Sequence, residues 1–187
     1  LPGNRYPTAR YLSDGNEREA SIIGNTPSQI ALAEAPYAKS AEPWYAKRWP
    51  AVRAVRKHSA TIEAEARTFD VDPDLVRAIM YVENAQGWYG HVPEHYGFAK
   101  SIFPMNIRPD KWSALGFSRA DFDRPEVNIR AAVMLIRRIQ DRLDRPTVSK
   151  VATLYNSLPK DSVSDYGARV AEAYRTKEWL RPAEIWE

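Results

Sequence analysis

The chain has 187 residues, 44% of them hydrophobic and 27% charged, so it is long enough for one well-filled domain and is not disordered as a whole. It contains no cysteine, which excludes disulfides and thiolate catalysis. The net charge of +3 is mild and its charges are interspersed, a pattern that favours a mixed solvated surface over a nucleic-acid groove. No apolar run reaches the length of a membrane-spanning helix. The chain begins at Leu1 with no visible signal segment, so we expect a processed or trimmed chain, or one without a cleavable signal.

The first part of the chain, residues 1–45, is punctuated by prolines and glycines, which predicts an extension with little regular structure. Within it, only Ser28 to Ala35 has the composition of a short helix. The apolar residues with which this extension can dock are Leu12, Ile22, Ile23, Ile30 and Leu32. We therefore predict an extension (1–45), one folded domain (46–180) and a short C-terminal tail (181–187).

Two helices are expected next. From Pro50 to Phe69, apolar residues recur at three- and four-residue steps, with charged residues mostly off that stripe, which predicts one amphipathic helix. A short turn then leads into a second helix, from Asp72 to Asn84. Asp72 is a good N-cap, and Pro73 suits the first helical position, where a missing N–H has no cost.

Glu83 ends an apolar strip near the C-terminus of this second helix, since Val76, Ile79 and Glu83 fall three and four residues apart. Apolar surroundings and the negative end of the helix dipole both disfavour ionisation. The sequence therefore predicts a carboxyl that is partly protonated near neutral pH, as a general acid requires. The plain alternative is a surface Glu at a helix end.

The stretch from Gly87 to Asn106 is irregular and rich in aromatic residues, which indicates either a binding role or a cap over the core. It contains His91-Val92-Pro93-Glu94-His95, an H-x-x-E-H pattern found in some zinc peptidases. That chemistry needs both histidines on one face of a continuous helix, and Pro93 disfavours such a helix. We therefore expect no metal and no cofactor, with a zinc peptidase as an outside alternative.

The second half of the chain predicts helices only. Ser118 and Asp121 have the spacing of a capping arrangement, and Pro125 opens the longest helix. The expected helices cover Pro109–Leu115, Pro125–Leu143, Val148–Asn156 and Val163–Tyr174. Because no segment beyond a few residues alternates with period two, the predicted fold class is all-α.

Five features, taken in order, resemble the lysozyme-like domain of the soluble lytic transglycosylases and goose-type lysozymes. They are the Glu83 helix, Met105-Asn106-Ile107, the long Pro125 helix, Tyr155-Asn156, and the spaced Tyr166 and Val170. In that family a helix ends in a catalytic Glu, and a Gly-Leu-Met-Gln-like segment follows about twenty residues later. An Ala-x-Tyr-Asn motif and a further Tyr come after it. The resemblance spans roughly residues 46–175 and implies a lysozyme-like helical domain.

The resemblance also implies roles for individual residues. Glu83 corresponds to the catalytic acid, which then acts as base, and Met105 and Asn106 border the glycan groove. Tyr155 and Asn156 correspond to a pair that positions the substrate's N-acetyl group and supports the Glu, and Tyr166 to a Tyr close to that Glu. The chain departs from the family at Asn84, where Ser is usual, at Phe103-Pro104 before Met105, and at Ser157-Leu158 after Asn156.

The expected activity is cleavage of the MurNAc–GlcNAc β-1,4 bond of peptidoglycan to a 1,6-anhydro product. Ordinary glycosidases need two carboxylates, and Glu83 is the one with a suitable environment. A single Glu suffices if the substrate's N-acetyl group assists and its 6-hydroxyl closes the ring. Glu94 is the one plausible second carboxylate, and it would favour a hydrolytic muramidase. A non-catalytic glycan-binding module on the same fold is the alternative of another class.

Such an activity implies glycan strands as the main partner and a periplasmic or wall-facing location, reached by export or delivery. A chain delivered as an antibacterial effector would also have an inhibitor protein as partner, and one used in envelope assembly would meet secretion machinery. Neither nucleic acid nor a transmembrane segment is expected.

Overall fold

The computed structural model describes residues 32–33, 48–85, 104–108, 115–156 and 162–181. Of these residues 77% are helical and none lies in a β-strand, which confirms the all-α class for the described part of the chain. The α-helices are α2 (Arg48–Lys57), α3 (Ser59–Phe69), α4 (Pro73–Ala85), α6 (Pro125–Arg142), α7 (Val148–Asn156) and α8 (Asp165–Thr176), and the 3-10 helices are η3 (Arg119–Asp123) and η4 (Glu178–Leu180).

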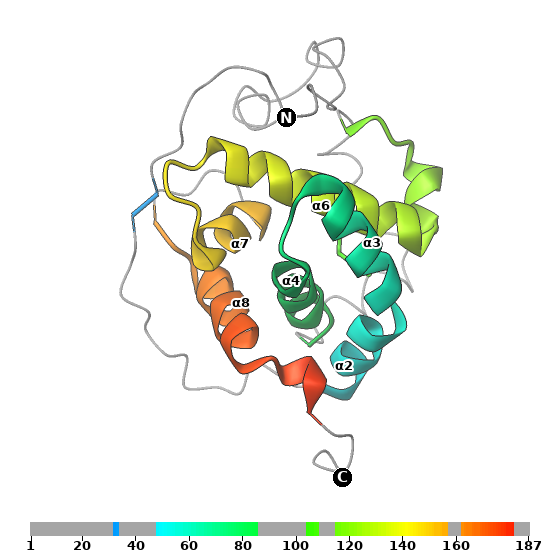
Figure 1. Ribbon diagram of the computed structural model, residues 1–187, viewed down its shortest axis with the longest axis horizontal. Coiled ribbons are helices and arrows are strands. Elements are labelled where there is room, and N and C mark those ends of the chain that lie inside the picture. Colours follow the sequence, from blue (N-terminus) through cyan, green and yellow to red (C-terminus); the bar gives the residue numbers. More distant parts are fainter. Residues whose placement is uncertain (1–31, 34–47, 86–103, 109–114, 157–161, 182–187) are drawn as a thin grey trace, which may run out of the picture.

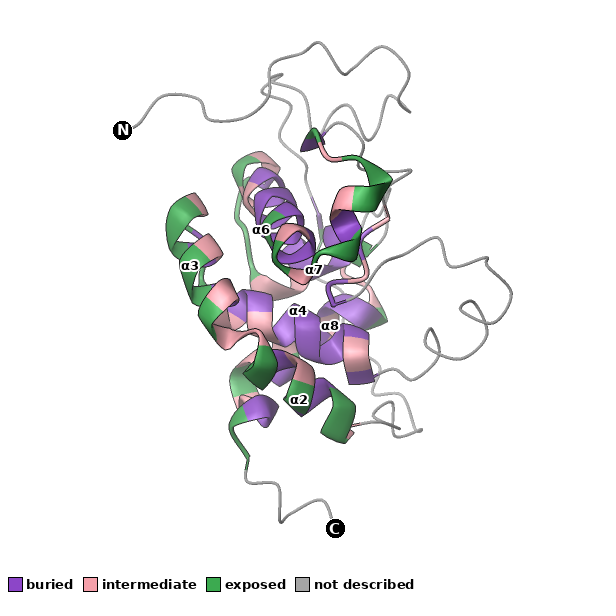
Figure 2. Ribbon diagram, turned by 90° about the vertical axis from the view of Figure 1, so that its right-hand side faces the viewer, coloured by how far each residue is buried: buried purple, intermediate pink, exposed green. Residues whose placement is uncertain are grey.

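Helix α4 lies at the centre, and the other helices form a ring around it (Figure 1). Helices α2, α3 and α8 pack directly against α4, while α6 bridges α3 and α7. Nine of the 13 residues of α4 are buried, and Figure 2 shows this helix covered on almost every side. A helix that is apolar nearly all round is suited to the interior of a domain.

The N-terminus of α4 is capped as expected. Asp72 lies just before the helix, and its Oδ1 accepts a hydrogen bond of 2.8 Å from the backbone N–H of Asp74. Pro73 is the first helical residue. These two residues fix where α4 begins and therefore how far along the interior its last turn, with Glu83, extends.

The single helix predicted from Pro50 to Phe69 is wrong, because the structure has two helices that meet at His58. Val52 and Val55 of α2 are buried, and α2 packs mainly against α4. The buried face of α3 instead lies against α6 and α4. A break at His58 lets each half direct its apolar face toward its own neighbour.

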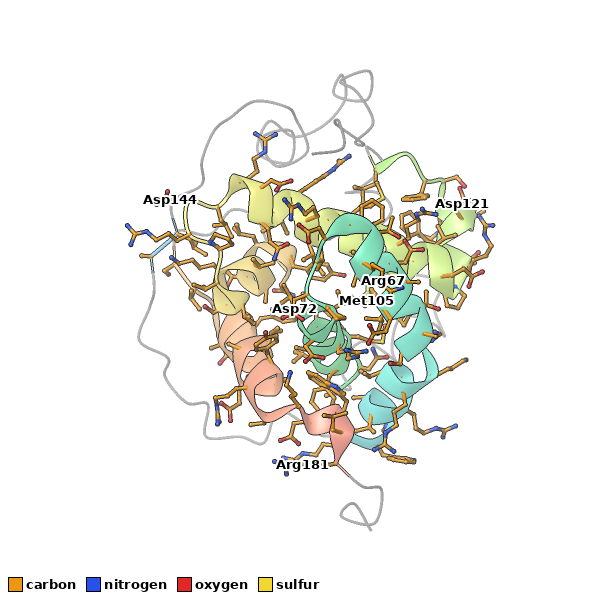
Figure 3. The ribbon with its side chains drawn as sticks, viewed as in Figure 1. Arg67, Asp72, Met105, Asp121, Asp144 and Arg181 are labelled. Carbon is orange, nitrogen blue, oxygen red and sulfur yellow. The ribbon has the colours of Figure 1, made fainter. Side chains whose placement is uncertain are left out.

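The long helix α6 begins and ends close to its predicted limits, with Pro125 at its first position and Leu143 as its C-cap. The predicted capping arrangement before it is confirmed, because Ser118 and Asp121 form a reciprocal capping box at η3. Charged side chains such as Asp121 and Asp144 lie at the periphery, whereas Met105 lies inside the ring of helices (Figure 3).

Helices α7 and α8 approach each other closely at Gly167. A Cβ atom at this position would overlap the Oγ1 of Thr153 and the carbonyl oxygen of Ser149. Thr153 Oγ1 donates to the Ser149 carbonyl oxygen at 2.7 Å and accepts from the backbone N–H of Ser164, the N-cap of α8, at 3.0 Å. This close packing brings Tyr166, next to the glycine, toward α4.

Part of the N-terminal extension is anchored on the domain. Leu32 is buried in the core, and Ala33 forms an isolated parallel bridge with Ser162. The Val163 N–H donates to the Ala33 carbonyl at 3.0 Å. The short helix expected over Ser28–Ala35 is therefore wrong at residues 32 and 33, because neither is helical and Ala33 pairs with the segment before α8.

Several predictions fall outside the described residues. These are the H-x-x-E-H pattern at His91–His95, the second carboxylate Glu94, and most of the short helix at Pro109–Leu115. Within the described ranges, none of the helices combines the length and hydropathy that crossing a bilayer would require. The division into extension, domain and tail stays a prediction.

Candidate active site

Glu83 lies in the last turn of α4 and is only 3% exposed. The apolar strip predicted to lead up to it is present, because Val76 and Ile79 are both fully buried on the same helix. The plain alternative of a surface Glu is therefore wrong. Burying a carboxyl is costly unless it is neutral or well hydrogen-bonded, so its immediate partners decide its chemistry.

Two neutral donors contact the Glu83 carboxyl, one on each oxygen. The Tyr166 hydroxyl, from α8, donates to Oε1 at 2.6 Å. The Asn106 side-chain Nδ2, from the 104–108 segment, donates to Oε2 at 2.7 Å. Among the described residues, no Lys, Arg or His forms an ion pair with this carboxyl. Within the described part of the chain, hydrogen bonds therefore stabilise its charge.

Burial raises the pKa of Glu83 to about 7, although the hydrogen bonds from Tyr166 and Asn106 act in the opposite direction. The negative end of the α4 dipole, two residues away at Ala85, also disfavours the charged form. The two protonation states are thus of similar free energy near neutral pH. A carboxyl of this kind can both donate and accept a proton during one reaction.

The 104–108 segment is held in place by side chains from three helices. Asn84 of α4 donates to the Pro104 carbonyl at 2.9 Å. Asn128 of α6 accepts from the Met105 N–H at 2.9 Å, and the Tyr155 hydroxyl of α7 donates to the Met105 carbonyl at 2.7 Å. Both backbone polar groups of Met105 are therefore satisfied by buried side chains, which fixes the position of the residue that follows.

Asn106, the next residue, has a left-handed backbone with φ of 54°. Asn tolerates this conformation better than most residues, because its short polar side chain suits αL. The conformation directs the side-chain amide toward Glu83. The amide oxygen, Oδ1, is buried and has no hydrogen-bond partner in the described part of the chain.

The structure brings together five of the six residues that the sequence singled out: Glu83, Met105, Asn106, Tyr155 and Tyr166. Tyr155 supports the Met105 backbone rather than contacting the carboxyl; burial and then the Glu83 charge raise the pKa of this phenol well above its usual value. The sixth residue, Asn156, is exposed at the end of α7. The roles of all six toward a glycan stay predictions.

Two residues of this arrangement were missed by the sequence reasoning. Asn128 is 0% exposed, and a polar residue in register with the buried Ala131, Ala132 and Leu135 of α6 was a visible signal for it. Asn84 was noted only as a departure from Ser. Its link to the Pro104 carbonyl spans 20 residues of sequence, which no local pattern reveals.

No group of three or more His, Asp or Glu side chains suited to a metal ion occurs within the described ranges. Comparison with protein-family models, with curated proteins and with solved structures finds no match to this chain. The geometry around Glu83 is therefore the basis on which a function can be inferred.

Proposed function

We propose that this chain is a peptidoglycan-cleaving glycosidase, a lytic transglycosylase that acts on the MurNAc–GlcNAc β-1,4 bond with Glu83 as its acid and base. The observation that carries the proposal is the state of this carboxyl: it is buried, contacted by two neutral donors, and has a pKa of about 7. The ordered resemblance of the flanking segments to the lysozyme-like domain supplies the substrate class.

The proposed reaction uses one carboxyl twice. Protonated Glu83 gives its proton to the glycosidic oxygen as the bond from that oxygen to C1 breaks, and the carbonyl oxygen of the substrate's N-acetyl group bonds to C1. The Glu83 carboxylate then takes the proton of the C6 hydroxyl, whose oxygen bonds to C1 and displaces the N-acetyl oxygen. No water is consumed, and Glu83 ends protonated again.

The same environment serves both steps. Burial favours the neutral acid, which is required for the first transfer. The hydrogen bonds from Tyr166 and Asn106 stabilise the carboxylate that forms, so its basicity for the second transfer is not excessive. A pKa near the working pH serves a group that must pass a proton in each direction.

The test is mass spectrometry of the soluble products released from purified peptidoglycan by the parent chain and by Glu83→Gln. A matched control is Glu172→Gln, which makes the same change at an exposed position of α8. We expect 1,6-anhydro products from the parent and the control, and a loss of at least about a thousandfold in Glu83→Gln.

Other outcomes have definite meanings. Products with reducing ends would mean hydrolysis, that is, a muramidase, and would direct attention to Glu94 as the second carboxylate. Absence of products from the parent would contradict the enzyme proposal and leave a glycan-binding module. The proposed substrate places the chain's action at the periplasmic side or the cell wall, with an inhibitor protein or envelope machinery as further partners.

A further inference from the structure

The nitrogen of the Asn106 side-chain amide contacts Glu83, and its oxygen has no partner among the described residues. Its Nδ2 donates to Glu83 Oε2, while its buried Oδ1 has no partner. Tyr166 also donates to the carboxyl, on Oε1. This arrangement, with donors on both oxygens, complements a carboxylate and offers no acceptor for a proton on Oε2.

A protonated Glu83 needs a different partner at Oε2. Once that oxygen carries hydrogen it becomes a donor, and a donor facing the Asn106 N–H group makes no hydrogen bond. Oε1 remains a carbonyl oxygen in the acid form, so Tyr166 continues to donate to it. Rotating the Asn106 amide by half a turn replaces Nδ2 by Oδ1 and supplies the acceptor that the acid form lacks.

This rotation leaves the number of hydrogen bonds that the Asn106 amide makes unchanged. Because Oδ1 is unpaired when Nδ2 contacts Glu83, the rotated amide also makes one bond and leaves one end unpaired. The backbone is meanwhile held, since Asn128 and Tyr155 bind both polar groups of Met105. The two orientations are therefore matched to the two charge states of the carboxyl.

We propose that Asn106 is a positioning residue for both protonation states of Glu83: its Nδ2 donates to the carboxylate, and its Oδ1, after a half rotation, accepts from the carboxylic acid. The described groups that face this carboxyl are the phenols Tyr166 from α8 and Tyr155 from α7, and no described charged group joins them. Among the described residues, a proton on Oε2 thus has Asn106 as its reversible partner. The catalytic meaning of this rotation rests on the proposed function, in which Glu83 is acid first and base second.

The experiment is an NMR titration of the full chain with the Asn106 side-chain amide assigned, recorded about two pH units above and below the Glu83 midpoint. At the higher pH we expect a nuclear Overhauser effect from the Asn106 Nδ2 protons to the Glu83 methylene protons. At the lower pH we expect this effect to be lost and the Asn106 carbonyl carbon to move downfield as Oδ1 accepts a hydrogen bond from the protonated Glu83. Equal Overhauser effects at both pH values would overturn the proposal.

Glu83→Gln supplies a matched form that cannot ionise. Tyr166 selects the Gln oxygen as its acceptor, so the Gln amide nitrogen faces Asn106 and requires Oδ1 there. We expect the Asn106 signals of this variant to resemble the low-pH parent at every pH. Signals that resemble the high-pH parent would contradict the inference.

Asn106→Asp provides a second measurement, because a carboxylate at 106 can accept but cannot donate to an ionised Glu83. We expect the Glu83 midpoint to rise by at least about one pH unit, since two carboxylates would share one proton. The control is Asn156→Asp, which adds the same charge at the exposed end of α7 and is expected to leave the midpoint within a few tenths of a unit. An unchanged midpoint in Asn106→Asp would contradict the inference.

These readouts need no substrate, so the two proposals fail separately. A chain that rotates Asn106 but releases no glycan fragments would overturn the proposed function and leave the inference standing. A chain that cleaves peptidoglycan with a fixed Asn106 would do the reverse.

Discussion

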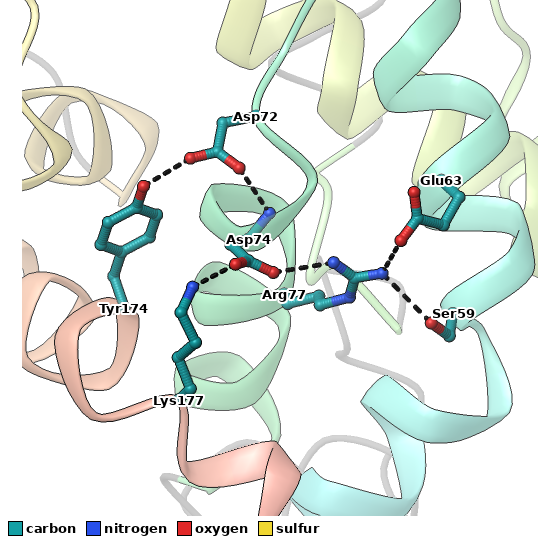
Figure 4. Close-up of polar contacts among 7 residues, drawn as sticks. All are labelled: Ser59, Glu63, Asp72, Asp74, Arg77, Tyr174 and Lys177. Carbon is teal, nitrogen blue, oxygen red and sulfur yellow. Dashed lines mark hydrogen bonds and ion pairs between the residues drawn. The ribbon is translucent and has the colours of Figure 1, made fainter.

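Helix α4 carries carboxyl groups at both ends, and their surroundings are opposite. At its N-terminal end, Asp72 and Asp74 lie in a partly exposed network with Arg77, Lys177 and Tyr174 (Figure 4). At its C-terminal end, Glu83 is buried, and its hydrogen-bond partners among the described residues are both neutral donors. At one end of this helix the pKa of Asp74 is lowered, and at the other end the pKa of Glu83 is raised to about 7.

Cations determine the direction in which the pKa of Asp74 is shifted at the N-terminal end of α4. Burial alone would raise the pKa of Asp74, but hydrogen bonds and charges from Lys177 and Arg77 outweigh it and lower that pKa below its usual value. Arg77 also forms an ion pair with Glu63 of α3. These contacts join α3, α4 and Lys177, the C-cap of α8. Their role is to hold the helices together.

Both carboxyls accept hydrogen bonds, but among the described residues a cation contacts Asp74 and none contacts Glu83. Two hydrogen bonds near 2.6–2.7 Å do not overcome its burial, and its pKa remains at about 7. A carboxyl pKa that burial raises strongly is a common feature of functional carboxyls. The two ends can be tested against each other by substitution.

The largest effect is expected for Glu83→Gln at alkaline pH. The folded pKa of about 7 lies above the ordinary 4.5, so the stability contributed by protonation is complete below pH 4.5 and is lost as pH rises through 7. The difference between these two pKa values corresponds to about 3 kcal/mol. Urea unfolding across this range should show the variant about 3 kcal/mol more stable than the parent above pH 8 and nearly equal to it near pH 4. A difference in unfolding free energy between variant and parent that does not depend on pH would mean that Glu83 titrates normally.

Gly167→Ala should disturb both ends of α4 at once. Helix α8 carries Tyr166, which contacts Glu83 at the C-terminal end of α4, and Tyr174, which contacts Asp72 at the N-terminal end. The new Cβ would overlap Thr153 Oγ1 and the Ser149 carbonyl oxygen, so α7 and α8 must separate. We expect a loss of about 2 kcal/mol in the free energy of unfolding. Helix propensity alone gives the opposite sign, a gain of up to about 1 kcal/mol, so a stabilised variant would contradict the close packing.

Arg77→Met removes the cation between Asp74 and Glu63 at the N-terminal end. The Arg77 side chain is 12% exposed, so its pairs are partly shielded from water, and we expect a loss of about 1–2 kcal/mol at neutral pH. The pKa of Asp74 should rise in the same variant, while that of Glu83 should stay where it is. Carboxyl NMR measures both, and a displaced Glu83 midpoint would show that the two ends are coupled.

The smallest effects come from two matched tyrosines. Tyr166 and Tyr174 donate to carboxyls at 2.6 and 2.5 Å, the first in a buried hydrogen bond and the second in an exposed one. Tyr166→Phe should raise the pKa of Glu83 by about one pH unit and move the pH profile of glycan release with it. Tyr174→Phe should leave that profile unchanged and cost under about 1 kcal/mol of stability. Equal profiles in both variants would remove Tyr166 from the proposed site.

Local signals in the sequence were enough to predict α4, α6, α7 and α8. Asp72 with Pro73 and the apolar periodicity determined α4, and Pro125 determined the start of α6. The burial of Glu83 followed from its place on the apolar strip of its own helix. Each of these depends on residues within a few positions of one another, which is the range over which caps and periodicity act.

What the sequence did not reveal depends on distant partners. The break at His58 exists because α2 and α3 face different helices, and the extended backbone at Ala33 exists because Ser162 and Val163 pair with it. The contacts of Asn106 with Glu83 and of Asn128 with Met105 each span 23 residues. Neither periodicity nor a cap encodes such a contact.

The most direct test of the central claim is a carbon-13 NMR titration of the side-chain carboxyls, with Glu83 assigned from the signal that disappears in Glu83→Gln. We predict a Glu83 midpoint of about 7 and, in the same spectra, an Asp74 midpoint below 3.8. A Glu83 midpoint close to 4.5 would show that the buried end of α4 holds an ordinary carboxylate, and would contradict its role as acid and base.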